Sequence, residues 1–181
     1  MATTTSPKQY SRQDAQAILA KFREYSFDAL HPMFKEGKAP TFGEIEGDTT
    51  GSVVAWNPKT PRWRRFVLRI SLDNLLAHWA GKRFMSTFDQ GKRGRAKLLF
   101  RSRFISSAIS FDTYIKKALF DQAPCLAADY CHFPASIIGM VDDLRRIDDG
   151  ILLGQNYHKL PWDKEHTFAF YFVMCALKKG E

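Results

Sequence analysis

The sequence predicts a mainly β protein whose strands form an antiparallel barrel of about eight to nine strands. After residue 79, segments of strand length follow one another to residue 177, and short runs of turn residues separate them. No segment of crossover length interrupts them, so neighbouring strands are expected to pair in antiparallel fashion. Closing such a sheet into a barrel removes its exposed edges. An N-terminal helical segment and a helical insertion after the first strand complete the predicted fold.

The chain of 181 residues is expected to form a single domain. Residues 1–10 are polar and rich in Thr and Ser, which predicts a flexible N-terminus. They contain no apolar stretch of the kind found in a signal peptide or a membrane anchor, so we expect no membrane span. Residues 11–40 form the helical segment, and residues 41–181 form the barrel.

The helical segment is expected to begin at Ser11, whose hydroxyl can cap a helix with Asp14 at the third position. Apolar side chains then recur at helical spacing up to about Tyr25, at Ala15, Ile18, Leu19 and Phe22. The next apolar stretch, Phe27–Phe34, is broken by Pro32. Its apolar side chains Phe27, Leu30 and Phe34 could plug one end of the barrel.

The first strand is predicted at Ser52–Trp56, because this stretch is β-branched and is followed by the turn dipeptide Asn57-Pro58. Between Pro61 and Trp79 the apolar residues recur mostly three or four apart, which predicts a helix. The polar face of this helix carries three basic residues, Arg62, Arg65 and Arg69.

The remaining strands are predicted from runs of strand length that are bounded by turn residues. They are Lys82–Phe88, Arg95–Phe100, Phe104–Ile109, Ile115–Phe120, Cys125–Tyr130, Ile138–Ile147, Ile151–Tyr157 and Thr167–Leu177. The turns between them, such as Ser110–Thr113 and Asp121–Pro124, are short enough for hairpins.

The composition favours an apolar interior and a basic surface. Aromatic residues make up 14% of the chain, so a core or cavity wall would be lined with rings, which suits an apolar or planar ligand. The formal net charge of +8 favours encounters with anions. The dense basic stretch from Lys92 to Arg103 has only Phe100 and Phe104 as nearby rings and contains no nucleic-acid motif, so we rank nucleic-acid binding last among the possible functions.

Cysteine usage indicates a reducing compartment, the cytoplasm. The chain has three cysteines without paired spacing, Cys125, Cys131 and Cys175, which argues against a disulfide framework. We expect them to be buried thiols. The adjacent pair Cys131 and His132 is weak as a metal site, because neighbours in a strand face opposite ways. No metal site and no cofactor are therefore expected.

The most informative stretch runs from Ile138 to Gly154. In a strand, Asp143 and Arg145 point to one face, whereas Asp142 and Arg146 point to the other. Whichever face lines the interior therefore brings one carboxylate and one guanidinium inside, where they could pair or hold the polar end of a ligand. The alternative is a structural salt bridge or a surface charge ladder, and the pattern alone does not decide between the two faces.

Motifs of the common enzyme classes are absent from the sequence: there is no Gly-x-Ser-x-Gly, Walker loop, Gly-x-Gly-x-x-Gly or His-Glu-x-x-His. Isolated carboxylates could act as an acid or a base, and Tyr130 could donate a hydrogen bond to a carbonyl, but their spacing singles out no catalytic residue.

Several short motifs follow one another along the chain: Pro40-Thr41, Gly47-Asp48-Thr49-Thr50-Gly51, Trp79-Ala80-Gly81-Lys82-Arg83-Phe84, Asp129-Tyr130, Asp142-Asp143-Leu144-Arg145 and Gly150-Ile151-Leu152-Leu153-Gly154. From Pro40 to the C-terminus this order resembles uncharacterised bacterial lipocalin-like proteins, which are calycin-type β-barrels related to the GXWXG proteins. The sequence departs from their pattern at Thr49, Asp143 and Leu152, where Trp, Glu and Tyr are usual.

The resemblance implies a lipocalin-like barrel with a pocket for an apolar ligand, and it implies no known reaction. It makes Lys82, Asp143 and Arg145 the leading polar candidates inside the barrel or at its mouth. With the neighbouring aromatic residues, the candidate ligand-binding residues are Lys82, Asp143, Arg145, Tyr130, Tyr157 and Trp79.

Three functions stay open at this point. The first is a carrier that binds a small hydrophobic or amphipathic molecule in the barrel. The second is a cofactor-free cyclase or isomerase that confines a hydrophobic polyketide- or terpenoid-like substrate. The third, nucleic-acid binding through the basic surface, rests on charge alone.

Overall fold

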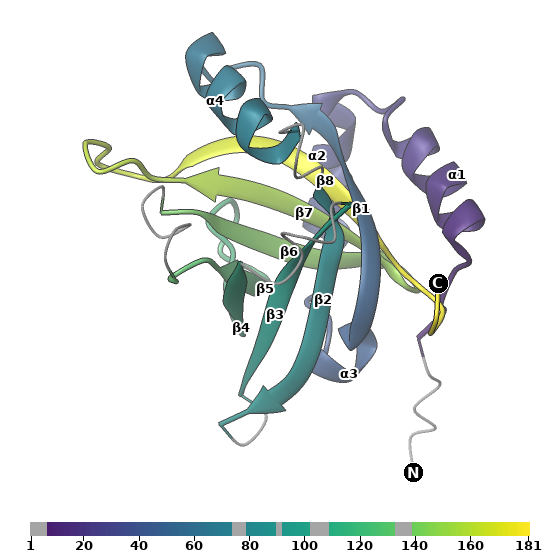
Figure 1. Ribbon diagram of the computed structural model, residues 1–181. Helices are drawn as coiled ribbons and strands as arrows, with labels where there is room; N and C mark the ends of the chain where they lie inside the picture. Colours follow the sequence, from purple (N-terminus) through teal and green to yellow (C-terminus); the bar gives the residue numbers. More distant parts are fainter. Residues whose placement is uncertain (1–6, 74–78, 90–91, 102–108, 133–138) are drawn as a thin grey trace.

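The protein is a closed antiparallel barrel in which each strand pairs with its neighbour in sequence and the last strand pairs with the first (Figure 1). The computed structural model describes residues 7–73, 79–89, 92–101, 109–132 and 139–181. Within these ranges the eight strands are β1 (Gly47–Trp56), β2 (Trp79–Phe88), β3 (Arg93–Phe100), β4 (Ser110–Lys117), β5 (Pro124–Asp129), β6 (Val141–Asp148), β7 (Ile151–His158) and β8 (Thr167–Ala176). The predicted mainly β barrel is confirmed.

The N-terminal segment forms two helices, α1 (Arg12–Phe22) and α2 (Phe27–Glu36). Ser11 caps α1 as predicted, since its hydroxyl accepts a hydrogen bond from the backbone N–H of Asp14. Pro32 lies inside α2 without ending it. Burial of Leu30 and Phe34 offsets the hydrogen bond that Pro32 cannot donate.

The two helices cover the outside of the barrel. Alternation along β8 places Phe172 in the interior, whereas Tyr171 and Val173 point outward and join a second apolar cluster. Leu30 and Phe34 of α2 belong to this outer cluster. The expectation that the apolar residues of Phe27–Phe34 plug one end of the barrel is therefore wrong, because the outward face of β8 is apolar and needs a cover.

Two further helices lie at opposite ends of β1. α3 (Phe42–Ile45) precedes β1, and α4 (Arg62–Asp73) follows it as the predicted helical insertion (Figure 1). Ile45 of α3 and Leu68 of α4 both reach the interior cluster. None of the helices in the described ranges is long and apolar enough to cross a membrane.

One predicted turn is a strand. Residues 110–113 form the first half of β4, which pairs with β3 on one side and with β5 on the other. These ladders and the burial of Phe111 outweigh the local turn preference. β4 ends at Lys117, so the strand predicted at Ile115–Phe120 begins too late and ends too late. The strand predicted at Phe104–Ile109 falls almost entirely outside the described residues.

Candidate functional site

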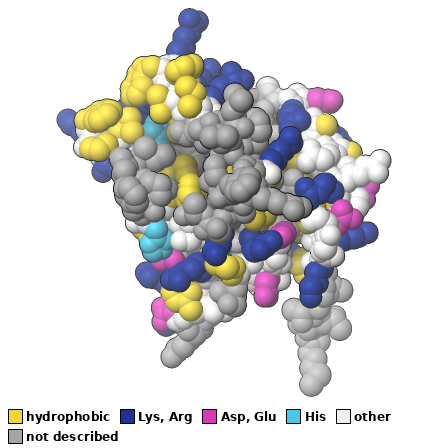
Figure 2. Space-filling model, viewed as in Figure 1, with side chains coloured by type: hydrophobic (Ala, Val, Ile, Leu, Met, Phe, Trp, Pro, Cys, Tyr) yellow, Lys and Arg dark blue, Asp and Glu magenta, His cyan; other side chains and the backbone are white. Residues whose placement is uncertain are grey.

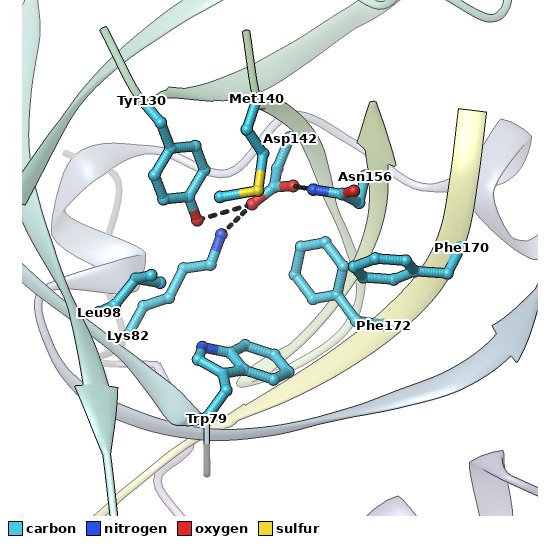
Figure 3. Close-up of a pocket in the computed structure, with 9 residues that line it drawn as sticks. All are labelled: Trp79, Lys82, Leu98, Tyr130, Met140, Asp142, Asn156, Phe170 and Phe172. Atoms are coloured by element: carbon cyan, nitrogen blue, oxygen red, sulfur yellow. Dashed lines mark hydrogen bonds and ion pairs between the residues drawn. The ribbon is translucent and has the colours of Figure 1, made fainter. Parts of the chain in front are cut away.

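A cavity lies inside the barrel at the end where α4 connects β1 to β2. Strand residues and their immediate neighbours supply its wall: Trp79, Lys82, Leu98, Tyr130, Met140, Asp142, Asn156, Phe170 and Phe172 (Figure 3). It leaves about 20 Å³ for the centre of a water molecule. That is room for about one water, so the aromatic and aliphatic side chains nearly fill the interior.

A hydrogen-bonded polar cluster stands in this apolar interior. The ammonium group of Lys82 forms an ion pair with the carboxylate of Asp142. The hydroxyl of Tyr130 donates to Oδ2 of Asp142 at 2.9 Å, and Nδ2 of Asn156 donates to Oδ1 at 2.6 Å. Lys82 and Asp142 are 1% and 2% exposed. Three donors therefore hold one carboxylate in a place where an unpaired charge would be very unfavourable.

Aromatic rings surround the Lys82 ammonium. Its nitrogen lies 4.8 Å from the ring centre of Phe172, 5.1 Å from that of Phe111 and 5.3 Å from that of Tyr130, distances suited to cation–π attraction. Burial nevertheless lowers the pKa of Lys82, and the nearby Asp142 acts in the opposite direction. Burial and the same carboxylate raise the pKa of Tyr130, so its hydroxyl stays a hydrogen-bond donor.

Two polar atoms of the cavity wall have no hydrogen-bond partner among the described residues. They are the indole N–H of Trp79, a donor, and Oδ1 of Asn156, an acceptor. Buried polar atoms are rarely left unsatisfied in a folded protein. A molecule in this cavity would satisfy them by presenting one acceptor and one donor.

The register of the sheet decides which charges face the cavity. Asp142 pairs with Ala128 of β5 and with Asn156 of β7, and its side chain points inward. Asp143 and Arg145 therefore point outward, toward α2 and the β4–β5 connection. The expectation that these two residues lie in the cavity or at its mouth is wrong, because alternation along β6 puts neighbouring side chains on opposite faces.

Both outward charges make structural contacts. The guanidinium of Arg145 binds the Asp121 carboxylate with two hydrogen bonds of 2.6 and 2.7 Å and donates to backbone carbonyls of Phe34, Ala123 and Pro124. The carboxylate of Asp143 accepts from the backbone N–H of Leu119 at 2.7 Å and pairs with Lys116 at 2.8 Å. Arg145 and Asp143 therefore fix α2 and the β4–β5 turn against the barrel.

Of the six predicted ligand-binding residues, Trp79, Lys82 and Tyr130 line the cavity. Tyr157 faces outward, where its hydroxyl donates to Gln155 at 2.8 Å and its ring contacts Phe168. Sequence reasoning did not single out Asn156, Phe170 or Phe172, because an amide and two phenylalanines in ordinary strands carry no pattern of their own.

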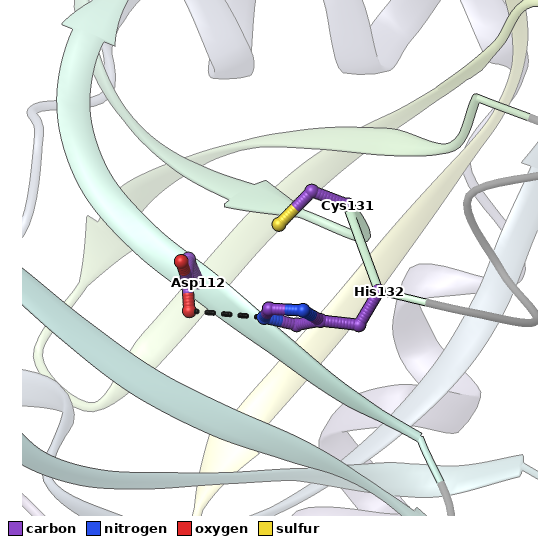
Figure 4. A group of neighbouring side chains, drawn as sticks. All are labelled: Asp112, Cys131 and His132. Carbon is purple, nitrogen blue, oxygen red and sulfur yellow. Dashed lines mark hydrogen bonds and ion pairs between the residues drawn. The ribbon is translucent and has the colours of Figure 1, made fainter.

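A second group of polar side chains lies outside the cavity. Asp112, Cys131 and His132 place one potential ligand atom each within 4.8 Å of one another (Figure 4). Cys131 is exposed, so the expectation of three buried thiols is wrong for this residue, which follows the end of β5. Burial raises the pKa of Cys131, as do the nearby carboxylates, of which Asp129 has the largest effect, so the neutral thiol is favoured. The guanidinium of Arg95 lies 3.8 Å from the carboxylate of Asp112. We assign no ion to this group.

Comparison with known proteins identifies a protein of similar fold and indicates no activity. No protein-family model matches the chain, and no curated protein matches it. The structure is similar to a solved structure of a protein from Thermomonospora curvata, with a TM-score of 0.50 and 12% sequence identity, over 92% of this chain and 97% of that one. At this identity the likeness supports the barrel fold alone.

Proposed function

We propose that the protein binds a small, mainly apolar and uncharged molecule inside the barrel, in the manner of a lipocalin-like carrier. The observation that supports this is the charge-balanced polar cluster of Lys82, Asp142, Tyr130 and Asn156 within an aromatic interior. Lys82 and Asp142 already neutralise each other, so an ionic ligand would bring an unpaired charge into the interior. The unpartnered Trp79 donor and Asn156 acceptor would hold a hydroxyl or carbonyl group of the ligand.

Entry of such a molecule requires some cavity side chains to move. Met140 and Trp79 are half-buried and lie at the end of the barrel near α4, so they are the wall residues with the most freedom. Methionine adapts readily to a ligand, because its side chain is unbranched. The polar head would therefore sit between the Trp79 N–H and Asn156, and the apolar body would extend toward Met140.

The preference for an uncharged ligand can be tested with three probes that share the same hydrocarbon skeleton: cinnamyl alcohol, cinnamate and cinnamylamine. Titration calorimetry is expected to give at least about tenfold tighter binding for the alcohol than for either ion, since one unpaired buried charge costs more than 1.4 kcal/mol. Trp79→Phe removes the N–H donor and is expected to weaken binding of the alcohol about fivefold. Trp63→Phe, at an exposed position of α4, is the matched control. Equal binding of all three probes, or no binding of any, would contradict the proposal.

A second candidate is a cofactor-free cyclase or isomerase acting on a hydrophobic substrate. It draws support from an amine whose pKa is lowered by burial, beside a carboxylate and a phenol in one enclosed space. Such a site can move a proton between two positions of a bound molecule. Product formation from an unsaturated ketone, lost in both Lys82→Met and Asp142→Asn, would favour this candidate over simple binding.

A further inference from the structure

We propose that Lys82 captures an aldehyde ligand as a reversible imine, with Asp142 as the counter-ion of the resulting cation. This inference rests on the proposed binding function and names the chemical class of the ligand. Lys82 is the only lysine among the described residues that line the cavity. Its nitrogen lies against one carboxylate and three aromatic rings, and its side chain is 1% exposed.

Burial prepares this amine for addition to a carbonyl group. An ammonium ion is no nucleophile, and desolvation in an apolar pocket is a recognised way to obtain the neutral amine at neutral pH. Burial shifts Lys82 in this direction. The carboxylate of Asp142 is in contact with the nitrogen and can take up the proton that the ammonium releases.

The reaction needs no oxidant, reductant or further reactant. The lone pair of Nζ forms a bond to the aldehyde carbon, and the carbonyl oxygen takes a proton to give a carbinolamine. The C–O bond then breaks, the oxygen leaves as water, and a C=N bond forms. The net change converts one lysine ammonium and one aldehyde into one protonated imine and one water.

The surroundings suit the product as well as they suit the lysine. The protonated imine keeps a single positive charge at the same nitrogen, so the ion pair with Asp142 and the contacts with the rings are retained. An aldehyde is also uncharged before it reacts, which agrees with the charge balance of the cavity. A carboxylate ligand would instead compete with Asp142 for the ammonium.

Reductive trapping of the native protein tests the step. The protein is incubated with cinnamaldehyde and cyanoborohydride, and the labelled lysines are identified by peptide mapping. Lys82 is expected to be modified at least about tenfold faster than the exposed Lys117, because binding concentrates the aldehyde beside it. Lys82→Arg keeps a cation and should lose this modification together with the red-shifted absorbance of the imine, whereas Lys117→Arg should retain both.

The mapping of the native protein decides the question even if the Lys82→Arg variant does not fold. Modification of Lys82 no faster than that of Lys117 would overturn the proposal. Binding of cinnamyl alcohol separates the two hypotheses: if the alcohol binds and Lys82 is not trapped, only the imine fails. If the alcohol does not bind either, the proposed function fails with it.

A second inference rests on α4, whose apolar stripe faces solvent. Trp63, Phe66 and Ile70 recur three or four residues apart and are 51%, 66% and 50% exposed. Trp162, on the β7–β8 connection, is 71% exposed. Figure 2 shows hydrophobic side chains gathered over α4 with basic side chains beside them. On the inward side, Leu68 reaches the interior cluster and Arg64 binds Asp163 at 2.5 and 2.8 Å, so α4 is held in this orientation.

We infer that this surface docks on an anionic lipid bilayer. Exposed Arg62 and Arg69 flank the apolar stripe, and the whole chain carries a net charge of +8. A helix with aromatic residues on one face and arginines beside them matches the composition of helices that lie in a membrane interface. The same positive charge opposes association of two copies through this face. Docking here would bring the cavity end of the barrel to the lipid, where apolar molecules accumulate.

Vesicle sedimentation tests the docking. Binding to vesicles of phosphatidylglycerol and phosphatidylcholine is expected to exceed binding to pure phosphatidylcholine by at least about tenfold, with about a fivefold loss for each of Arg62→Gln and Arg69→Gln. Trp63→Ser with Phe66→Ser should abolish the bound fraction, whereas Phe88→Ser, on β2, should not change it. Equal binding to both vesicles would overturn the inference. Concentration-dependent dimerisation lost in Phe66→Ser would also overturn it, in favour of a second copy of this chain.

Discussion

The Lys82–Asp142 pair gives a stability prediction whose magnitude depends on pH. Asp142→Asn leaves the Lys82 amine buried without a counter-charge. The protein can relieve this by releasing the proton from Lys82, which for an amine with an ordinary pKa of 10.5 costs about 5 kcal/mol at pH 7. We therefore expect Asp142→Asn to lower the free energy of unfolding by about 3 to 5 kcal/mol at pH 7.

The pH dependence of this loss follows from the same release of a proton. In the variant, native Lys82 is neutral while the unfolded chain still binds the proton below pH 10.5. The unfolded state then holds more protons, so stability rises with pH by about 1.4 kcal/mol per pH unit, and the loss shrinks toward alkaline pH. Lys82→Met leaves the Asp142 carboxylate buried with only the Tyr130 and Asn156 donors and is expected to cost about 3 kcal/mol.

Urea unfolding of the wild type and both variants from pH 6 to pH 9 measures these slopes, with about 1.4 kcal/mol per pH unit as the expected limit. The double variant Lys82→Met/Asp142→Asn removes both charges and should cost clearly less than the two single losses together. A pH profile of Asp142→Asn that runs parallel to that of the wild type would refute the reasoning, because it would mean that the Lys82 charge is not confined to the interior.

Three further predictions concern groups outside the cavity. Arg145→Ala should lower the free energy of unfolding, measured with urea, by about 3 to 5 kcal/mol, since the Asp121 carboxylate and several backbone carbonyls lose their hydrogen-bond donor. A loss below about 1 kcal/mol would contradict a structural role for Arg145. Burial lowers the pKa of His158, so the folded protein holds its side chain neutral while the unfolded chain binds a proton below pH 6.5. The free energy of unfolding should therefore fall as the pH drops below 6.5, by at most about 1.4 kcal/mol per pH unit. A His158→Gln variant should lack this decrease. A disulfide reagent should modify Cys131 faster than Cys125 and Cys175 in the native protein, because Cys131 is exposed and burial raises the pKa of the two other thiols to about 12. Equal rates would show that the native structure exposes Cys125 and Cys175.

Local sequence signals predicted the elements well where the physical cause was local. The Ser11 cap, the helical insertion before Trp79 and the hairpin-linked strands from Lys82 onward all depend on neighbouring residues. The described residues contain the cap, the helix and these strands except the one predicted at Phe104–Ile109, which lies almost entirely outside them. β4 departed from its prediction because its pairing with β3 and β5 overrides the turn preference of residues 110–113.

Some residues of the candidate site could likewise be predicted from the sequence, whereas others could not. The Trp79–Phe84 motif and Tyr130 directed attention to three residues that do line the cavity. Asn156 could not be found from sequence, because its role depends on lying opposite Asp142 across the β6–β7 ladder. Pairing between strands is a property of the closed barrel and has no signature in either strand alone.

The sequence by itself determined that β6 carries an acid and a base on each face, since successive side chains of a strand must alternate. Only the tertiary structure decided that Asp142 faces the cavity, that Arg146 pairs with Glu44 at the other end of the barrel, and that Asp143 and Arg145 point outward, toward the β4–β5 connection and α2. The choice rests on packing. α1 and α2 cover one apolar face of β7 and β8, barrel closure covers the other, and β6 takes the register that its neighbours impose.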